Sequence, residues 1–215
     1  MGTAFRLNKK GLTLIELLVG MVISAIVVAG IYRLFISQGK AYVVQDQVVE
    51  VQQNVRSAME VMLRDLRMAG FDDDITPLVT NPEPPVLPGD SSVTIRYEYA
   101  SAPYEVLYSL DAGSVLNRLE TKNGVSGPTE TILENVDDLT FWYGVDEDND
   151  NAMDDRNGNG LADDWVSAGT AGNLKVVAVR VSLTGSAMQV NPDLQNVKPR
   201  TLVSAVTLRN LSLMR

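Results

Sequence analysis

The chain has 215 residues, 45% of them hydrophobic, and a net charge of −9, which is enough for one folded domain with an appendage. It contains no cysteine and no histidine, so disulfides, zinc–thiolate sites and the commonest general base are excluded. These absences argue against an enzyme, and the acidic balance argues against nucleic-acid binding by the folded part.

The N-terminal segment combines a basic start with a long apolar run. Lys9 and Lys10 precede about 25 residues, from Leu12 to Ile36, in which Glu16 and Arg33 are the only charges. The apolar centre of an ordinary signal peptide has roughly 7–15 residues, whereas a bilayer-spanning helix needs about 20. The sequence therefore predicts a single membrane span, and the charge before it favours a cytoplasmic N-terminus.

Glu16 is not explained by a plain membrane anchor, because a carboxylate inside an apolar span is unfavourable unless it lies near the interface or is paired with a cation. Cleavage after Gly11 would create one, the new α-amino group of Leu12. Positions 12 and 16 would lie on one face of a helix. In an assembly, the amine of an incoming subunit could pair with Glu16 of its neighbour.

The segment from Lys9 to Val19 reads Lys-Lys-Gly-Leu-Thr-Leu-Ile-Glu-Leu-Leu-Val. It resembles the type III signal of type IV pilins and of type II secretion pseudopilins. This resemblance implies that a prepilin peptidase removes the leader, residues 1–11, by cutting after Gly11. It also implies methylation of Leu12, and it places Glu16 at the family's fifth mature position.

The same resemblance implies a location in the bacterial inner membrane with a periplasmic domain, followed by incorporation into a fibre at the cell surface. Two departures favour a minor pilin or a pseudopilin over a major pilin. The mature chain would begin with leucine instead of phenylalanine, and the chain has no proline before Pro77 and no cysteine pair.

The predicted helix has two halves, a membrane-spanning and assembly half over residues 12–37 and an amphipathic half over residues 38–70. In the second half, apolar residues recur every three or four positions and Gly70 marks the expected stop. The stretch from Leu63 to Phe71 resembles the end of the long helix in PilW-type minor pilins.

Residues 71–215 are predicted to form one β-rich domain. The proline-rich segment from Asp72 to Asp90 is interpreted as a loop, and the aromatic residues Phe141, Trp142 and Tyr143 are expected in the core and on the sheet surface. Strands are expected at 92–99, 105–110, 114–119, 131–133, 138–145, 174–184 and 201–208. One long helix followed by strands predicts an α+β fold with a mostly antiparallel sheet.

Between Asp146 and Asp164, eight acidic residues stand against a single Arg156, and residues 146–163 form two successive nine-residue repeats. Side-chain oxygens at repeat positions 1, 3, 5 and 9, with Asn or Gly at position 6, are typical of calcium loops. No bidentate Glu follows at position 12, so the pattern resembles the Asp/Asn loops of repeat-type extracellular proteins more than an EF-hand. The alternative is a solvated acidic loop. The candidate ligands are Asp146, Asp148, Asp150, Asp154, Asp155, Asn157, Asn159 and Asp163.

The sequence thus indicates a minor type IV pilin that primes or joins pilus assembly and carries a calcium-binding loop. Its expected partners are prepilin peptidase, other pilin subunits and the inner-membrane assembly platform. Two alternatives stay open: a minor pseudopilin of a type II secretion system, and a tip adhesin or DNA-uptake module on the same scaffold.

Overall fold

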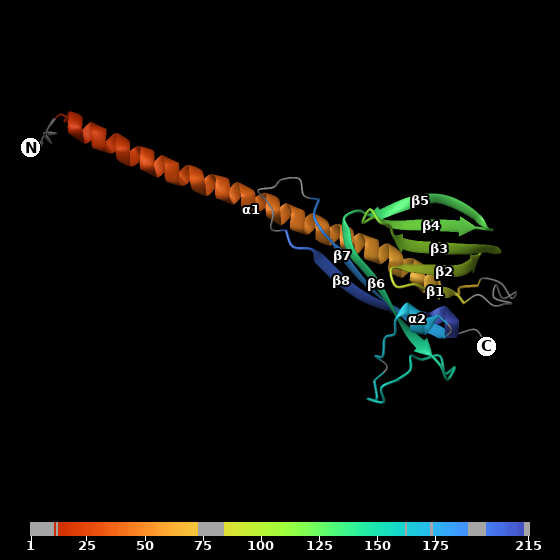
Figure 1. The fold of residues 1–215 in the computed structure, drawn as a ribbon. Helices are drawn as coiled ribbons and strands as arrows, with labels where there is room; N and C mark the ends of the chain where they lie inside the picture. The colour runs from red at the N-terminus through yellow and green to blue at the C-terminus, as the bar shows by residue number, and fades with distance from the viewer. Residues whose placement is uncertain are drawn as a thin grey trace, which may run out of the picture. The chain divides into compact units, whose positions relative to one another are not determined.

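The computed structural model describes residues 11, 13–72, 84–161, 163–172, 174–188 and 197–212. The chain divides into two compact units, residues 1–46 and residues 47–215. One helix, α1 (Leu14–Met68), contributes to both of them. With the strands that follow, it makes the α+β fold that the sequence predicts (Figure 1).

In the first unit, the large apolar side chains of α1 are exposed throughout, as for Leu14, Ile26 and Phe35. No proline interrupts this part of the helix, and its leucine and isoleucine side chains have no protein core to enter. Among the described residues, α1 is the helix that is long and apolar enough to cross a membrane, as judged by its length and composition. Exposed apolar side chains on every face of a helix are suited to lipid or to other helices.

In the second unit, α1 forms one wall of the hydrophobic core. Its buried residues recur every three or four positions, and they include Val55, Met59, Met62 and Leu66. The helix ends before Gly70, whose φ of 68° is the left-handed conformation that glycine adopts readily. The predicted glycine stop is therefore found, and the buried face of the helix extends from Val51 to Leu66.

Five strands form an antiparallel meander with the order β1-β2-β3-β4-β5. They are β1 (Val86–Pro88), β2 (Ser92–Tyr99), β3 (Ala102–Leu110), β4 (Leu116–Lys122) and β5 (Val125–Leu133). The interpretation of residues 72–90 as a loop is wrong for β1, which pairs with β2 from Val86 to Pro88. Pro88 is tolerated here because β1 is an edge strand, in which a residue can lack the backbone N–H that a central strand needs for its hydrogen bonds.

A second antiparallel sheet has the order β6-β7-β8. Its strands are β6 (Val136–Asp146), β7 (Lys175–Gly185) and β8 (Arg200–Thr207), and the short helices are α2 (Ala168–Ala171) and η2 (Arg209–Ser212). The acidic segment, residues 146–164, therefore belongs to the connection between two neighbouring strands. Phe141 and Tyr143 lie in the core as expected, and Trp142 is half-buried.

Both sheets pack on α1. At Gly185, at the end of β7, an added Cβ would lie only 2.7 Å from Cγ2 of Val55. A larger residue there would push helix and strand apart, so the glycine permits the close approach.

A buried ionic network joins α1 to the five-stranded sheet. Nε of Arg118 donates to Oδ2 of Asp65 over 2.8 Å, and the hydroxyl of Tyr108 donates to the same oxygen over 2.7 Å. Arg118 also contacts Glu120 and Glu130. Burial disfavours the charged guanidinium, but the hydrogen bonds to Asp65 and Glu120 outweigh it and raise the pKa of Arg118. The network satisfies each buried charge and connects the helix with β3, β4 and β5.

Candidate functional site

The predicted processing site lies at the beginning of α1. Gly11 is exposed, Leu12 lies outside the described residues, and α1 begins two residues later, at Leu14. The relation between the Leu12 amine and Glu16 thus stays a prediction. Glu16 lies in the first turn of the helix and its side chain is exposed.

Thr13 caps the helix that carries Glu16. The hydroxyl of Thr13 accepts a hydrogen bond from the backbone N–H of Glu16 over 3.3 Å. Thr-x-x-Glu at a helix start is the pattern of a capping box, in which the two side chains satisfy free backbone donors of the first turn. Thr13 is not among the predicted site residues, although the Thr-x-x-Glu pattern is present in the sequence. The cap therefore fixes the backbone of Glu16 in the first turn of the helix.

The acidic segment contains two turns with the same backbone geometry. In the first repeat, Asn149 and Asn151 have φ values of 63° and 69°, and in the second, Gly158 and Gly160 have values of 73° and 81°. These are positions 4 and 6 of each nine-residue repeat. Asparagine and glycine are the residues that adopt this left-handed conformation most readily. The repeat seen in the sequence is therefore also a repeat in structure.

The hydrogen bonds of the two turns correspond as well. The carboxylate at position 1, Asp146 or Asp155, accepts the backbone N–H groups of positions 5 and 6. The side chain at position 3, Asp148 or Asn157, accepts the N–H of position 5 again. Side-chain oxygens from positions 1 and 3 are thus gathered on the inside of each turn, as a cation site of this type requires.

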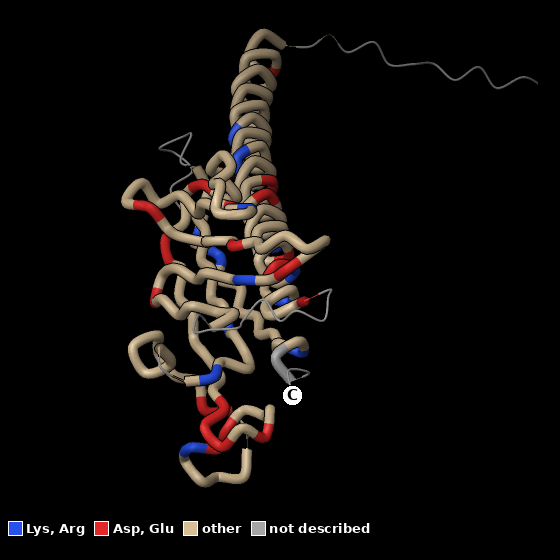
Figure 2. Tube along the Cα trace, turned by 90° about the vertical axis from the view of Figure 1, so that its right-hand side faces the viewer, with Lys and Arg blue, Asp and Glu red and all other residues tan. Residues whose placement is uncertain are grey.

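The first turn brings three of the predicted ligands together. One carboxylate oxygen each from Asp146, Asp148 and Asp154 lies within 4.8 Å of the others, a spacing that can hold a metal ion. Oδ1 of Asp150 instead accepts the N–H of Ala152. In Figure 2, where Asp and Glu positions are coloured red along the Cα trace, the acidic positions gather along this segment.

The second turn is closed by Asp164, which is not among the predicted calcium ligands. Asp164 accepts the backbone N–H of Asn157 over 2.7 Å, whereas Asp163 contacts the Asn159 amide only at 3.5 Å. In the first turn, Asp154 at position 9 makes the corresponding contact, with the N–H of Glu147. The second turn thus closes one residue later than the repeat pattern predicts.

Lys175 contacts the first turn and is not among the residues that the sequence pattern predicts for this site. Its ammonium lies 2.7 Å from Oδ2 of Asp146 and 2.6 Å from Oδ1 of Asn151, at the base of the first turn. Burial acts to raise the pKa of Asp146, but the hydrogen bonds from Lys175 and from backbone N–H groups prevail, so the pKa lies below its usual value. The first turn therefore contains a cation of its own.

The segment is anchored on the outer face of the three-stranded sheet. Met153 packs against Gly144 of β6, since a Cβ added at Gly144 would lie 2.7 Å from the Met153 sulfur. Further along, Val166 and Tyr143 exchange backbone hydrogen bonds of 2.9 Å, and the Arg180 guanidinium lies over the Trp165 ring at 4.2 Å. Apolar and cation–π contacts thus hold both flanks of the acidic turns.

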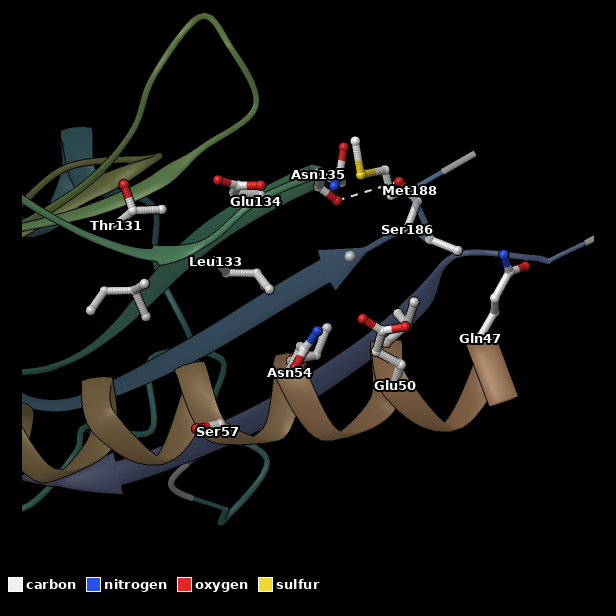
Figure 3. A pocket seen from close by; sticks show the side chains of 15 residues that line it. Gln47, Glu50, Asn54, Ser57, Thr131, Leu133, Glu134, Asn135, Ser186 and Met188 are labelled. Carbon is white, nitrogen blue, oxygen red and sulfur yellow. Dashed lines mark hydrogen bonds between the residues drawn. The ribbon is translucent and has the colours of Figure 1, made fainter. Parts of the chain in front are cut away.

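A hollow of about 460 Å³ opens between α1, the corner where β5 passes to β6, and the end of β7 (Figure 3). The charged groups among its lining residues are two carboxylates, Glu50 and Glu134, beside amides such as Asn54 and Asn135. The lining residues that the structure describes include no lysine or arginine.

Two family models match the chain. The prokaryotic N-terminal methylation motif matches residues 6–32, which include the basic start, Gly11, Thr13 and Glu16. The type IV pilus-assembly protein W family matches residues 104–210, from β3 beyond β8, and the acidic segment lies inside this match. The chain belongs to the PilW-type minor pilins. No curated protein and no solved structure matches it.

In this PilW-type pilin, the processing motif and the acidic segment lie in different parts of the chain. The processing motif precedes an apolar helix that fits single-pass anchoring in the inner membrane. The acidic segment lies within the part of the chain that matches the family, and three of its carboxylates have a spacing that could hold a metal ion. Both matched families are structural components of pili rather than enzymes.

Proposed function

We propose that this minor pilin primes or joins the assembly of a type IV pilus after prepilin peptidase has cut it behind Gly11. The observation that carries the proposal is the methylation motif over residues 6–32, continued by an apolar helix with Glu16 in its first turn. The match to a pilus-assembly family favours the pilus over a type II secretion system.

Assembly depends on the charge of Glu16. A carboxylate within an apolar span is unfavourable by about 3 kcal/mol unless a cation accompanies it. Cleavage supplies the α-amino group of Leu12, and in a growing fibre this amine pairs with Glu16 of a neighbouring subunit. The exposed apolar face of α1 then exchanges lipid contacts for contacts with other pilin helices.

This role defines the partners and the location. The uncut chain spans the inner membrane once, with its N-terminus in the cytoplasm and its domain in the periplasm. It is a substrate of prepilin peptidase, which also methylates Leu12, and it then engages the assembly platform and other pilins before it reaches the fibre.

The acidic segment binds calcium in this proposal. Its ligands are hard oxygens of carboxylates and amides, which suit calcium better than a transition metal. The second turn is the preferred site, because glycine occupies both of its left-handed positions and no lysine contacts Asp155 in the described structure. Candidate ligands there are Asp155, Asn157, Asn159 and either Asp163 or Asp164.

The assembly proposal is tested with Glu16→Gln. Glutamine fits the third position of a capping box as well as glutamate, so the helix start is kept while the charge is removed. Thr13→Ala is the matched control, since it weakens the cap and keeps the carboxylate. In cells lacking the native chain, mass spectrometry should find both variants cut before Leu12 and methylated.

Only the Glu16→Gln variant should be depleted from sheared pili, by at least about tenfold if pairing contributes 1.4 kcal/mol or more. Incorporation of Glu16→Gln at the native level would refute the pairing mechanism. Recovery of a chain that still begins at Met1 would refute the processing step itself.

A further inference from the structure

The two sheets have four edge strands, and three of them are protected against pairing with another chain. β1 has three residues and ends in Pro88. β5 contains Gly127 and Pro128 and shifts register against β4. The outer backbone groups of β6 bond to Asp90 and to Val166. Short, irregular or covered edges of this kind prevent unintended strand pairing.

β8 differs from the other three edges. It pairs with β7 without a register shift over eight residues, from Arg200 to Thr207. The N–H of Leu208 bonds to the C=O of Val177, so the even-numbered residues of β8 direct their backbone groups toward β7. The odd-numbered residues direct theirs outward, where no described residue accepts or donates.

The outward positions are also suited to a strand. They are Thr201, Val203, Ala205 and Thr207, and all four side chains are exposed, Val203 by 55%. Threonine and valine have high strand propensity, and Arg200 is the one charge in the strand. Such an edge is a template for an added strand.

A basic hollow adjoins this edge. It measures about 570 Å³ and lies between α1 and the beginning of β8, with Arg56, Arg200, Gln52 and Gln53 in its lining. Nε of Arg200 is buried and has no hydrogen-bond partner in the described structure. No described carboxylate forms an ion pair with Arg56. A buried donor without a partner is unfavourable, and a guanidinium fits a carboxylate best.

We propose that β8 and this hollow together receive an extended acidic segment of another protein. The segment adds a fourth strand to the three-stranded sheet by backbone hydrogen bonds to residues 201, 203, 205 and 207. One of its carboxylates enters the hollow and accepts hydrogen bonds from Arg200 and Arg56. The open backbone ladder requires an extended partner, and the two unpaired arginines require an acidic one. This interaction depends neither on cleavage behind Gly11 nor on calcium.

The probe is an eight-residue peptide with blocked ends in which threonine and valine alternate. It carries one glutamate near its C-terminus, the end that lies beside Arg200 when the strand runs antiparallel to β8. A twin peptide has glutamine at that place. Binding to the full chain in detergent micelles is followed by fluorescence polarisation. Amide exchange at residues 201, 203, 205 and 207 is followed by NMR.

The glutamate peptide should bind at least about tenfold more tightly than its twin, the ratio that corresponds to 1.4 kcal/mol. It should slow exchange at the four outward amides. Arg200→Gln should remove the preference for glutamate, whereas the control Lys198→Gln, an exposed lysine two residues earlier, should keep it. Ala205→Pro, which removes an outward N–H, should weaken both peptides equally.

Equal affinity for the two peptides, or unchanged exchange at the four amides, would overturn the proposal. Should Ala205→Pro prevent folding, as circular dichroism would show, the comparison of Arg200→Gln with Lys198→Gln decides alone. A glutamate preference that survives Arg200→Gln would also count against it.

Discussion

Lys175→Met tests whether the first acidic turn is held together by an internal ammonium. In the native chain, the side chain of Asp146 is fully buried and Lys175 contacts it at 2.7 Å. Removing one partner of a buried ion pair costs 3–5 kcal/mol, and the lower end, about 3 kcal/mol, applies because Asp146 retains backbone donors. For a domain of this size, this corresponds to a fall in Tm of roughly 6–12 °C.

Calcium should reverse much of this loss, because an ion bound by Asp146, Asp148 and Asp154 replaces the missing ammonium. At a concentration 100 times its Kd, a ligand stabilises by about 2.7 kcal/mol. The assay is a thermal melt of the full chain in detergent, with a chelator and then with millimolar calcium. Lys198→Met serves as a control for loss of a lysine. An equal Tm deficit of Lys175→Met in both conditions would refute the reasoning.

Three further predictions concern the second turn and the core. Asp155→Ala should largely remove the rise in Tm that calcium causes in the native chain, since it deletes the carboxylate at position 1; an undiminished rise would place the ion elsewhere. Asp65→Ala should destabilise the domain by about 3 kcal/mol, because it leaves Arg118 buried without its main partner. In urea melts, combining it with Arg118→Met should cost clearly less than the two single changes together, and full additivity would contradict the network. Burial raises the pKa of both Tyr108 and Tyr143, so the folded state keeps protons that the unfolded state releases near pH 10. The contribution of these phenols to the free energy of unfolding should thus be fully present below that pH and be lost above it. In urea melts from pH 9 to 11.5, the free energy of unfolding should fall more steeply in the native chain than in Tyr108→Phe. Parallel declines would show that the Tyr108 phenol is not involved.

Much of the fold follows from local patterns in the sequence. The alternation of Val93 and Ile95 with polar neighbours predicts a strand over residues 92–99, and β2 has those bounds. The spacing of apolar residues in the second half of α1 likewise predicts the face that is buried. Periodicity is reliable here because each element has one face toward a single core.

The errors have local causes too. β1 lies among five prolines, which mask three residues of edge pairing. β5 was expected only at its last three residues because Gly127 and Pro128 interrupt its first part. The turn before it, Asn123-Gly124, has positive φ at both residues, and Asn-Gly between two strands is a strong hairpin signal.

The features of the acidic segment also differ in whether local sequence patterns determine them. The repeat of Asp, Asn and Gly is visible in the sequence because turn chemistry is local, and both repeats form turns with left-handed residues at positions 4 and 6. Lys175 could not be foreseen, since its contact with Asp146 depends on the register in which β6 pairs with β7. The closing contact of Asp164 depends on backbone geometry that the repeat pattern does not contain.

That pairing of Asp146 with Lys175 also closes the loop before any ion arrives. Bringing together the ends of a free loop of about 30 residues costs roughly 3 kcal/mol of chain entropy. Here the pairing of β6 with β7 already holds the two ends of the loop together. Ion binding therefore has to order only the side chains and turns within the loop. Removing the ion should accordingly loosen residues 147–174 alone, a confinement that hydrogen exchange can measure, while the sheet that the loop joins keeps its protection.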